Sequence, residues 1–164
     1  HGFLIFRVRV LRAYAHVNEN LLLKVDETIT HITSKADLEN EDGKIELAFT
    51  PERNLMVVDV VGTLDECRFT FDGQHVSKEI ARQFYRKTKW YNDVKKAKKR
   101  AETEGVKDWR KLCKSRPPQL DLALKTITSQ MYMAAANELT NRKLFDVPHL
   151  TDVIEKYSNY ASTS

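Results

Sequence analysis

Residues 67–84, CRFTFDGQHVSKEIARQF, contain the point at which the spacing of apolar residues along this chain changes. Before Asp72-Gly73, apolar and polar residues alternate, as they do along a half-buried β-strand. After it, apolar residues recur every three or four positions, which indicates an amphipathic helix. We therefore expect a sheet region in residues 1–74 and a helical region in residues 75–164, together forming one compact unit.

Upstream of this point the sequence predicts an antiparallel sheet of about five strands. Residues 3–10 and 44–50 alternate between apolar and other side chains, and residues 21–32 form a less regular strand candidate. Residues 55–63 are apolar on both faces, which is typical of a central strand. The short connections between successive strands favour antiparallel pairing.

Downstream, the sequence predicts a layer of three to four helices. A basic helix is expected over residues 76–103, because Gly105 provides a stop signal. A second helix follows the two prolines at 117–118 and ends near Leu139, and a third begins near Asp146. The fold class is therefore α+β, with the N-terminal sheet packed against C-terminal helices. The residues expected to share one core are Val57, Phe69, Ile80, Phe84 and Ile127.

The positive charge of the chain is concentrated in its middle. The net charge is +4, but residues 75–116 alone carry 15 Lys and Arg against five acidic residues. On a helical wheel of residues 76–103, a row of cations lies opposite the apolar stripe. Solvated helix faces usually mix both signs of charge, so this row favours binding to a polyanion. An ordinary solvated face and an acidic protein partner are the alternatives.

The sequence accordingly predicts a non-catalytic nucleic-acid-binding module within a ribonucleoprotein or other multiprotein assembly. RNA is favoured over DNA, with contacts mainly to the phosphate backbone. Arg7, Arg9 and Arg12 either extend the basic surface or pair with acids of neighbouring strands such as Glu46. The predicted nucleic-acid-binding residues are Lys78, Arg82, Tyr85, Arg86, Lys89, Lys96, Lys99 and Arg100.

An alternative function is that of a protein–protein interaction subunit that docks through its C-terminal helices. Residues 130–139, QMYMAAANEL, combine methionines with small residues that allow close helix packing. If these side chains are exposed, they would form an interface with another subunit. The interface residues of this alternative are Met131, Tyr132 and Met133.

The sequence contains no catalytic motif that we can identify, so it predicts no enzyme activity, no cofactor and no metal. It lacks a phosphate-binding glycine loop, a nucleophile elbow and a Cys-His grouping. A metal-dependent nuclease would use Asp59 with Asp65, Glu66 and Asp72. A salt bridge from Asp59 to Arg68 or to a helix lysine explains that strand carboxylate more simply.

Composition indicates an intracellular protein without membrane insertion. No apolar run approaches the length of a membrane-spanning helix. The two cysteines, Cys67 and Cys113, lie far apart, and there is no Asn-x-Ser/Thr glycosylation sequence. Because the first residue is His1 rather than methionine, we expect a fragment or a processed product.

Overall fold

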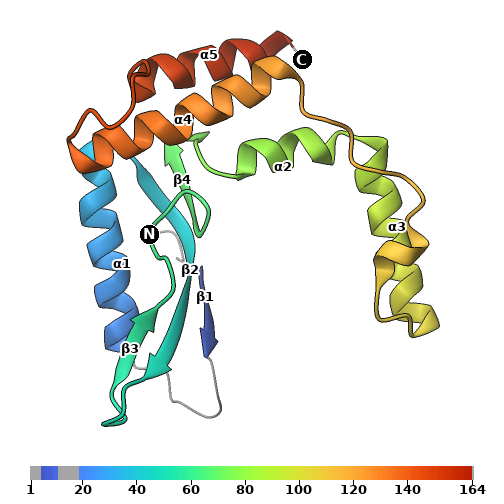
Figure 1. Cartoon of the computed structure of the whole chain (residues 1–164), viewed down its shortest axis with the longest axis horizontal. Helices are drawn as coiled ribbons and strands as arrows, with labels where there is room; N and C mark the ends of the chain where they lie inside the picture. The colour runs from blue at the N-terminus through green and yellow to red at the C-terminus, as the bar shows by residue number, and fades with distance from the viewer. Residues whose placement is uncertain (1–4, 11–18, 164) are drawn as a thin grey trace.

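The computed structural model describes residues 5–10 and 19–163 as an α+β fold (Figure 1), which confirms the predicted fold class. The strands are β1 (Ile5–Val10), β2 (Glu39–Phe49), β3 (Leu55–Val58), β4 (Cys67–Phe71) and β5 (Gln74–His75). The helices are α1 (Glu19–Thr33), α2 (Glu79–Arg86), α3 (Lys89–Glu104), α4 (Leu122–Thr140) and α5 (Leu150–Thr163). Two short 3-10 helices are η1 (Ser34–Ala36) and η2 (Trp109–Leu112).

The long strand β2 organises the sheet. β4 pairs with its first half and β3 with its second half, both antiparallel as predicted, and β5 pairs antiparallel with β4. β1 is parallel to β2, with Arg7 opposite Lys44 and Arg9 opposite Glu46 in the backbone register. Among the described strands, β3 pairs only with β2. The prediction that residues 55–63 form a central strand is therefore wrong.

The parallel pairing of β1 and β2 accompanies a helix that the sequence prediction missed. Residues 21–32, predicted as a strand, belong to α1. Val25, Ile29 and Thr33 are at least half-buried and recur every four residues, which is a helical spacing. Their β-branched side chains are typical of strands, and this preference misled the prediction. A helix between two neighbouring strands is the usual way to bring them parallel.

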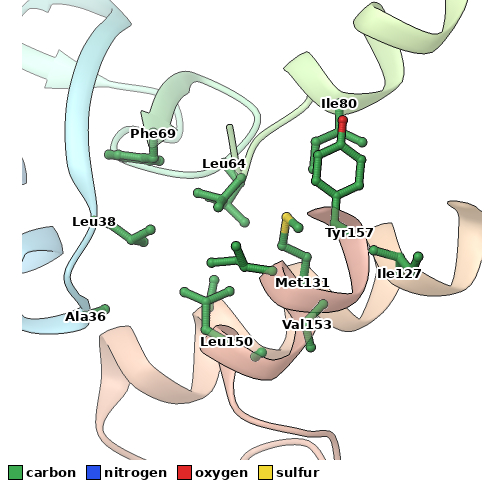
Figure 2. Packing of buried hydrophobic residues seen from close by; sticks show 14 of the residues in the cluster. Ala36, Leu38, Leu64, Phe69, Ile80, Ile127, Met131, Leu150, Val153 and Tyr157 are labelled. Carbon is green, nitrogen blue, oxygen red and sulfur yellow. The ribbon is translucent and has the colours of Figure 1, made fainter. Parts of the chain in front are cut away.

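The hydrophobic core lies where α4 and α5 cross the end of the sheet (Figures 1 and 2). Phe69 and Met131 are both fully buried there, and Leu64, Leu150, Val153 and Tyr157 surround them. Of the predicted core, Phe69, Ile80 and Ile127 belong to this cluster, and Phe84 packs against it as a partly buried side chain. Val57 does not belong to it. β3 carries Val57 at the end of the sheet away from α4 and α5 (Figure 1).

The helix predicted over residues 76–103 is interrupted. α2 ends at Arg86 and α3 begins at Lys89, because Thr88 adopts an extended backbone conformation (φ −90°, ψ 153°). Its hydroxyl accepts a hydrogen bond from the backbone N–H of Tyr91 at 3.2 Å, which makes it the N-cap of α3. The two helices point in different directions (Figure 1). A single helical wheel therefore does not describe this segment, and its cations do not form one continuous row.

Replacing Thr88 with alanine should destabilise the protein by about 1 kcal/mol, because the first turn of α3 loses its capping oxygen. Thr88→Ser keeps that oxygen and serves as the matched control. Urea denaturation followed by circular dichroism measures both variants. Equal unfolding free energies for the alanine and serine variants would show that the cap contributes nothing.

The C-terminal helices largely follow the predicted pattern. α4 buries Leu124, Ile127 and Met131 on one stripe, and Asp121 caps its N-terminus by accepting from the N–H of Leu124 at 2.8 Å. α5 begins at Leu150, four residues after the predicted start near Asp146, and the N–H of Leu150 donates to the carboxylate of Glu138. Within residues 5–10 and 19–163, no helix combines the length and apolarity needed to cross a lipid bilayer.

Candidate active site

Charged side chains gather on the face of β2 that points away from its buried residues. Ile45 and Leu47 are buried, whereas the alternating residues Asp42, Lys44 and Glu46 keep part of their surface exposed. The Lys44 amine lies 3.0 Å from a carboxylate oxygen of Glu46 and 3.2 Å from one of Glu66. These hydrogen bonds raise the pKa of Lys44. The strand alternation thus separates an apolar face from a charged one.

An arginine from β4 binds the first of these carboxylates. Arg68 donates to Asp42 through both Nε, at 2.8 Å, and Nη2. This two-point contact lowers the pKa of Asp42, and the more distant charges of Lys78 and Arg82 lower it further. The backbone N–H of Lys78 donates to the carbonyl of Leu64 at 3.5 Å, so the start of α2 lies beside the segment that leads into β4.

α2 contributes an ion-paired cluster around Glu79, whose side chain is only 3% exposed. Arg82 lies 3.4 Å from one carboxylate oxygen, and Arg86 contacts the other. Burial would raise the pKa of Glu79, but the two arginines lower it below its usual value. Strands and α2 together form a surface that we call the charged face. Its residues are Asp42, Lys44, Glu46, Glu66, Arg68, Lys78, Glu79, Arg82 and Arg86.

A pocket opens beside the segment of residues 59–66, which we call the acidic loop. Asp59, Asp65 and Glu66 line this pocket of about 510 Å³ together with residues of α4. Asp59 adopts a left-handed backbone conformation (φ 68°) just after β3 and is exposed. Of the two partners predicted for Asp59, Arg68 or a helix lysine, Arg68 is wrong, because it pairs with Asp42. The loop thus brings three acidic residues to the lining of one pocket.

Several contacts hold the acidic loop in place. Leu64 is buried in the core, and the carbonyl of Thr63 accepts from the N–H of Cys67 at 2.9 Å. Gly62 has a positive φ of 73°, and a Cβ there would lie 3.4 Å from Ile29 of α1. Glycine at this position permits both the backbone turn and the close approach of α1. The loop is therefore braced from the sheet side and from α1.

The structure also places a tyrosine of α4 against this loop. The hydroxyl of Tyr132 donates to a carboxylate oxygen of Asp65 at 2.8 Å. Burial and the hydrogen bond to Asp65 both raise the pKa of Tyr132, which favours the protonated hydroxyl that donates to Asp65. Asp65 is thereby held as a hydrogen-bond acceptor at the pocket.

The arrangement suits a charged small molecule. Arginine and lysine side chains recognise phosphate and carboxylate groups, and carboxylates accept protons or bind cations. Of the four acids considered as metal ligands, Asp59, Asp65 and Glu66 meet at the pocket, whereas Asp72 lies elsewhere, on the turn before β5. In the part of the chain that the structure describes, no three His, Cys, Asp or Glu side chains form a ready metal-binding group.

The predicted nucleic-acid-binding residues are divided among different surroundings. Lys78, Arg82 and Arg86 belong to the charged face, where Glu79 pairs with the two arginines. Arg100 on α3 pairs with Glu104 at 3.0 Å. The remaining predicted cations, Lys89, Lys96 and Lys99, are exposed on α3. Tyr85 makes an edge-on ring contact with Trp90. The expectation that no acid faces this row is wrong, because Glu79 and Glu104 both do.

The predicted protein interface also changes once the side chains are placed. Met131 is fully buried in the core and cannot contact another subunit in this fold. Tyr132 contacts Asp65, and Met133 is half-buried. Arg7, Arg9 and Arg12 were expected either to extend the basic surface or to pair with acids such as Glu46. Their side chains lie outside the part of the chain that the structure describes.

Sequence reasoning missed most of the charged face. One available signal was the alternation of Asp42, Lys44 and Glu46 along a strand, since it places three charges on one side. Another was the spacing of Glu79 before Arg82 and Arg86, which puts all three on one face of a helix. Neither signal by itself indicates which charges from other elements complete the surface.

The pairing of Asp42 with Arg68 should make the protein sensitive to acid. The pKa of Asp42 is lower in the folded state than in the unfolded chain, so this contribution to stability is complete above about pH 4 and disappears as the pH falls further. Asp42→Asn should therefore be less stable than the wild type at pH 7, with a difference that shrinks toward pH 2.5. Glu155→Gln, on an exposed position of α5, is the control.

Thermal or urea unfolding measured from pH 7 to pH 2.5 tests this expectation. A constant difference between wild type and Asp42→Asn across that range would contradict the assigned ion pair.

Comparison with known proteins identifies the family. The model of the SAICAR synthetase family matches residues 6–104, a range that contains the charged face and the acidic loop. A protein of Archaeoglobus fulgidus, "Putative phosphoribosylaminoimidazole-succinocarboxamide synthase", is 51% identical over 138 residues, covering 84% of this chain and 40% of the relative. No solved structure matches the chain significantly.

Two further relatives are named phosphoribosylaminoimidazole-succinocarboxamide synthase. The protein of Thermoplasma acidophilum is 37% identical over 98 residues, covering 56% of this chain and 33% of the relative. That of Thermoplasma volcanium is 35% identical over 91 residues, covering 51% of this chain and 31% of the relative. The chain thus spans well under half the length of these relatives.

These matches correct the functional predictions. The prediction of a non-catalytic RNA-binding module or assembly subunit is wrong, because the matched family and its named relatives are synthases. The predicted nucleic-acid or acidic-protein partner is wrong for the same reason. The basic segment that suggested nucleic acid lies within the family match. The chain belongs to the SAICAR synthetase family.

Proposed function

We propose that this chain forms part of an enzyme that makes a phosphoribosylaminoimidazole-succinocarboxamide, the product named for its relatives. The observation that carries the proposal is the charged face beside the acidic loop, since the residues of both lie inside the family match. The product name describes an amide between an aminoimidazole carboxyl group and an amine that bears a succinyl group. The substrates would then be a phosphorylated ribosyl compound and an amino dicarboxylate.

The chemistry of amide formation suggests separate tasks for the two surfaces. A C–N bond forms while a carboxyl C–O bond breaks, and oxide is a poor leaving group unless the carboxylate is first activated. Phosphoryl transfer from a nucleoside triphosphate such as ATP would convert the carboxylate into an acyl phosphate and release the diphosphate, and the attacking amine would then displace inorganic phosphate. Lys78, Arg82 and Arg68 would bind phosphate and carboxylate groups. Asp59, Asp65 or Glu66 would accept the proton that the attacking amine loses.

A nucleotide bound with Mg²⁺ also fits the carboxylates at the pocket. Mg²⁺ bound to substrate phosphates usually needs only one or two protein carboxylates, so the absence of a three-ligand cluster among the described residues is compatible with it. Asp59 and Asp65 are the candidates, because both line the pocket. A bound Mg²⁺ would neutralise charge that develops on the phosphates.

We also propose an intracellular location. Phosphorylated ribosyl compounds and nucleoside triphosphates are highly charged and do not cross membranes unaided, so an enzyme that uses them works where they are made. This location agrees with the composition, which has few cysteines.

A chimera tests the proposed activity directly. The segment of the Archaeoglobus fulgidus relative that matches this chain is replaced by the chain itself, which is 51% identical to it over 138 residues. Product formation from the two substrates and ATP is followed by mass spectrometry, with the unaltered relative as reference. We expect activity within about tenfold of the reference. A folded chimera without activity, beside an active reference, would reject the proposed function.

A further inference from the structure

The hydrogen bond between Tyr132 and Asp65 joins two parts of the chain that are 67 residues apart. Asp65 lies on the acidic loop, inside the residues that match the family, whereas Tyr132 lies on α4, beyond residue 104 where that match ends. Ala135, Ala136 and Leu139 of the same helix line the pocket with it. One wall of the pocket therefore comes from outside the matched region.

α4 is a rigid support for this tyrosine. The neighbouring residues Met131, Ala134 and Ala135 are each at most 1% exposed, which anchors the helix on both sides of Tyr132. α5 covers α4 with Leu150 and Val153, both fully buried (Figure 2). A side chain on a helix packed in this way has little freedom to move, so its hydroxyl remains at one point in the pocket.

Asp65 has no comparable support of its own. It lies in a loop, and the contacts on either side of it are made by Leu64, which enters the core, and Glu66, which pairs with Lys44. These contacts hold the two residues beside Asp65, but they do not hold Asp65 itself and leave its side chain free to rotate. The hydroxyl of Tyr132, which donates at 2.8 Å, selects one orientation of the carboxylate.

We propose that Tyr132 is a positioning residue that orients the carboxylate of Asp65 for the reaction in the acidic-loop pocket. The proposal rests on the proposed function for its catalytic part, because only a working synthase uses Asp65. Its structural part stands independently: the tyrosine hydroxyl orders the acidic loop. The two parts are tested by different measurements.

Tyr132→Phe is the informative variant, because it removes the hydroxyl and keeps the ring that packs on the pocket wall. In the active chimera, kcat should fall about 10- to 100-fold with little change in KM, since the hydroxyl contacts Asp65 rather than substrate. Tyr160→Phe is the matched control. It removes another tyrosine–aspartate hydrogen bond, to Asp121 at the far end of α4, and should leave kcat within about twofold.

A double-mutant cycle tests whether Tyr132 acts through Asp65. In the Asp65→Asn background, Tyr132→Phe should cause little further loss, because the group that it orients has already lost its charge. If Tyr132→Phe lowers kcat by the same factor with and without Asp65→Asn, Tyr132 does not act through Asp65. That result would overturn the proposal.

Hydrogen exchange on the chain itself gives a readout that needs no activity. The backbone N–H groups of Glu66 and Cys67 both donate to the carbonyl of Thr63, so they report on the acidic loop. Tyr132→Phe should speed their exchange about tenfold, while amides of β2 and α4 keep their wild-type rates. Unchanged exchange at Glu66 and Cys67 would remove the structural part of the proposal.

The outcomes separate the proposals. An inactive wild-type chimera with accelerated loop exchange in Tyr132→Phe rejects the proposed synthase function but supports the ordering role of Tyr132. An active chimera in which Tyr132→Phe keeps full kcat supports the function and rejects the positioning role. If Tyr132→Phe and Tyr160→Phe lose the same thermal stability, a loss of kcat in Tyr132→Phe alone would support positioning by Tyr132 over general destabilisation.

Discussion

Replacing Phe69 with alanine should lower the free energy of unfolding by about 3–5 kcal/mol. Phe69 is fully buried on β4, facing the core cluster that joins the sheet to α4 and α5 (Figure 2). Removing its ring leaves a cavity among Leu38, Leu64 and Met131 that the surrounding well-packed side chains cannot fill completely. An effect of this size is a large part of the stability of a small domain.

Phe145→Ala is the matched control, because the same ring is 42% exposed in the turn between α4 and α5. It should cost about 1 kcal/mol or less. Urea denaturation of both variants, with m-values compared, measures the difference. A Phe69→Ala variant within 1 kcal/mol of wild type would contradict the packing described here.

Replacing Asp65 with asparagine should reduce the synthase activity of the chimera at least about 100-fold. The substitution keeps the shape of the side chain but removes its charge and much of its ability to accept a proton. Asp59→Asn should have an effect of similar size. Asparagine tolerates the left-handed backbone that Asp59 adopts, so loss of activity there would reflect chemistry rather than folding.

Asp72→Asn is the control for both carboxylates. Asp72 also has a positive φ, of 47°, but it lies on the turn before β5, away from the acidic-loop pocket. Its activity should stay within about twofold of the unsubstituted chimera. Steady-state kinetics of the three variants test the site assignment. A loss in Asp72→Asn equal to that in Asp65→Asn would show that the carboxylates of the pocket have no special role.

The sequence by itself determined much of the secondary structure around the core. The change of apolar period near Asp72 marks the boundary between the last strands and α2, and the helix predicted between the prolines at 117–118 and Leu139 corresponds to α4. Both results rest on periodicity, which reports the side of an element that is buried. Periodicity is strong where one face is apolar and the other polar, as in α2, which buries Ile80 and packs Phe84 against the core.

Where local signals conflict, tertiary structure decided the outcome. Residues 21–32 contain β-branched residues at a spacing that fits a helix, and packing against the sheet selects α1. The break at Thr88 depends on one side-chain hydrogen bond, and threonine also occurs within continuous helices. Neither choice can be made from composition or spacing alone.

The candidate site depended most on tertiary structure. The sequence predicted a basic surface that contains Lys78, Arg82 and Arg86. In the structure, Glu79 and the charges of the neighbouring strands make this surface a mixed-charge site. The sequence predicted that Tyr132 contacts another subunit, whereas in the structure its hydroxyl donates to Asp65. A sequence records how many charges and hydroxyls a chain has. Which of them meet depends on the three-dimensional path of the backbone, because electrostatic and hydrogen-bond energies fall off within a few ångströms.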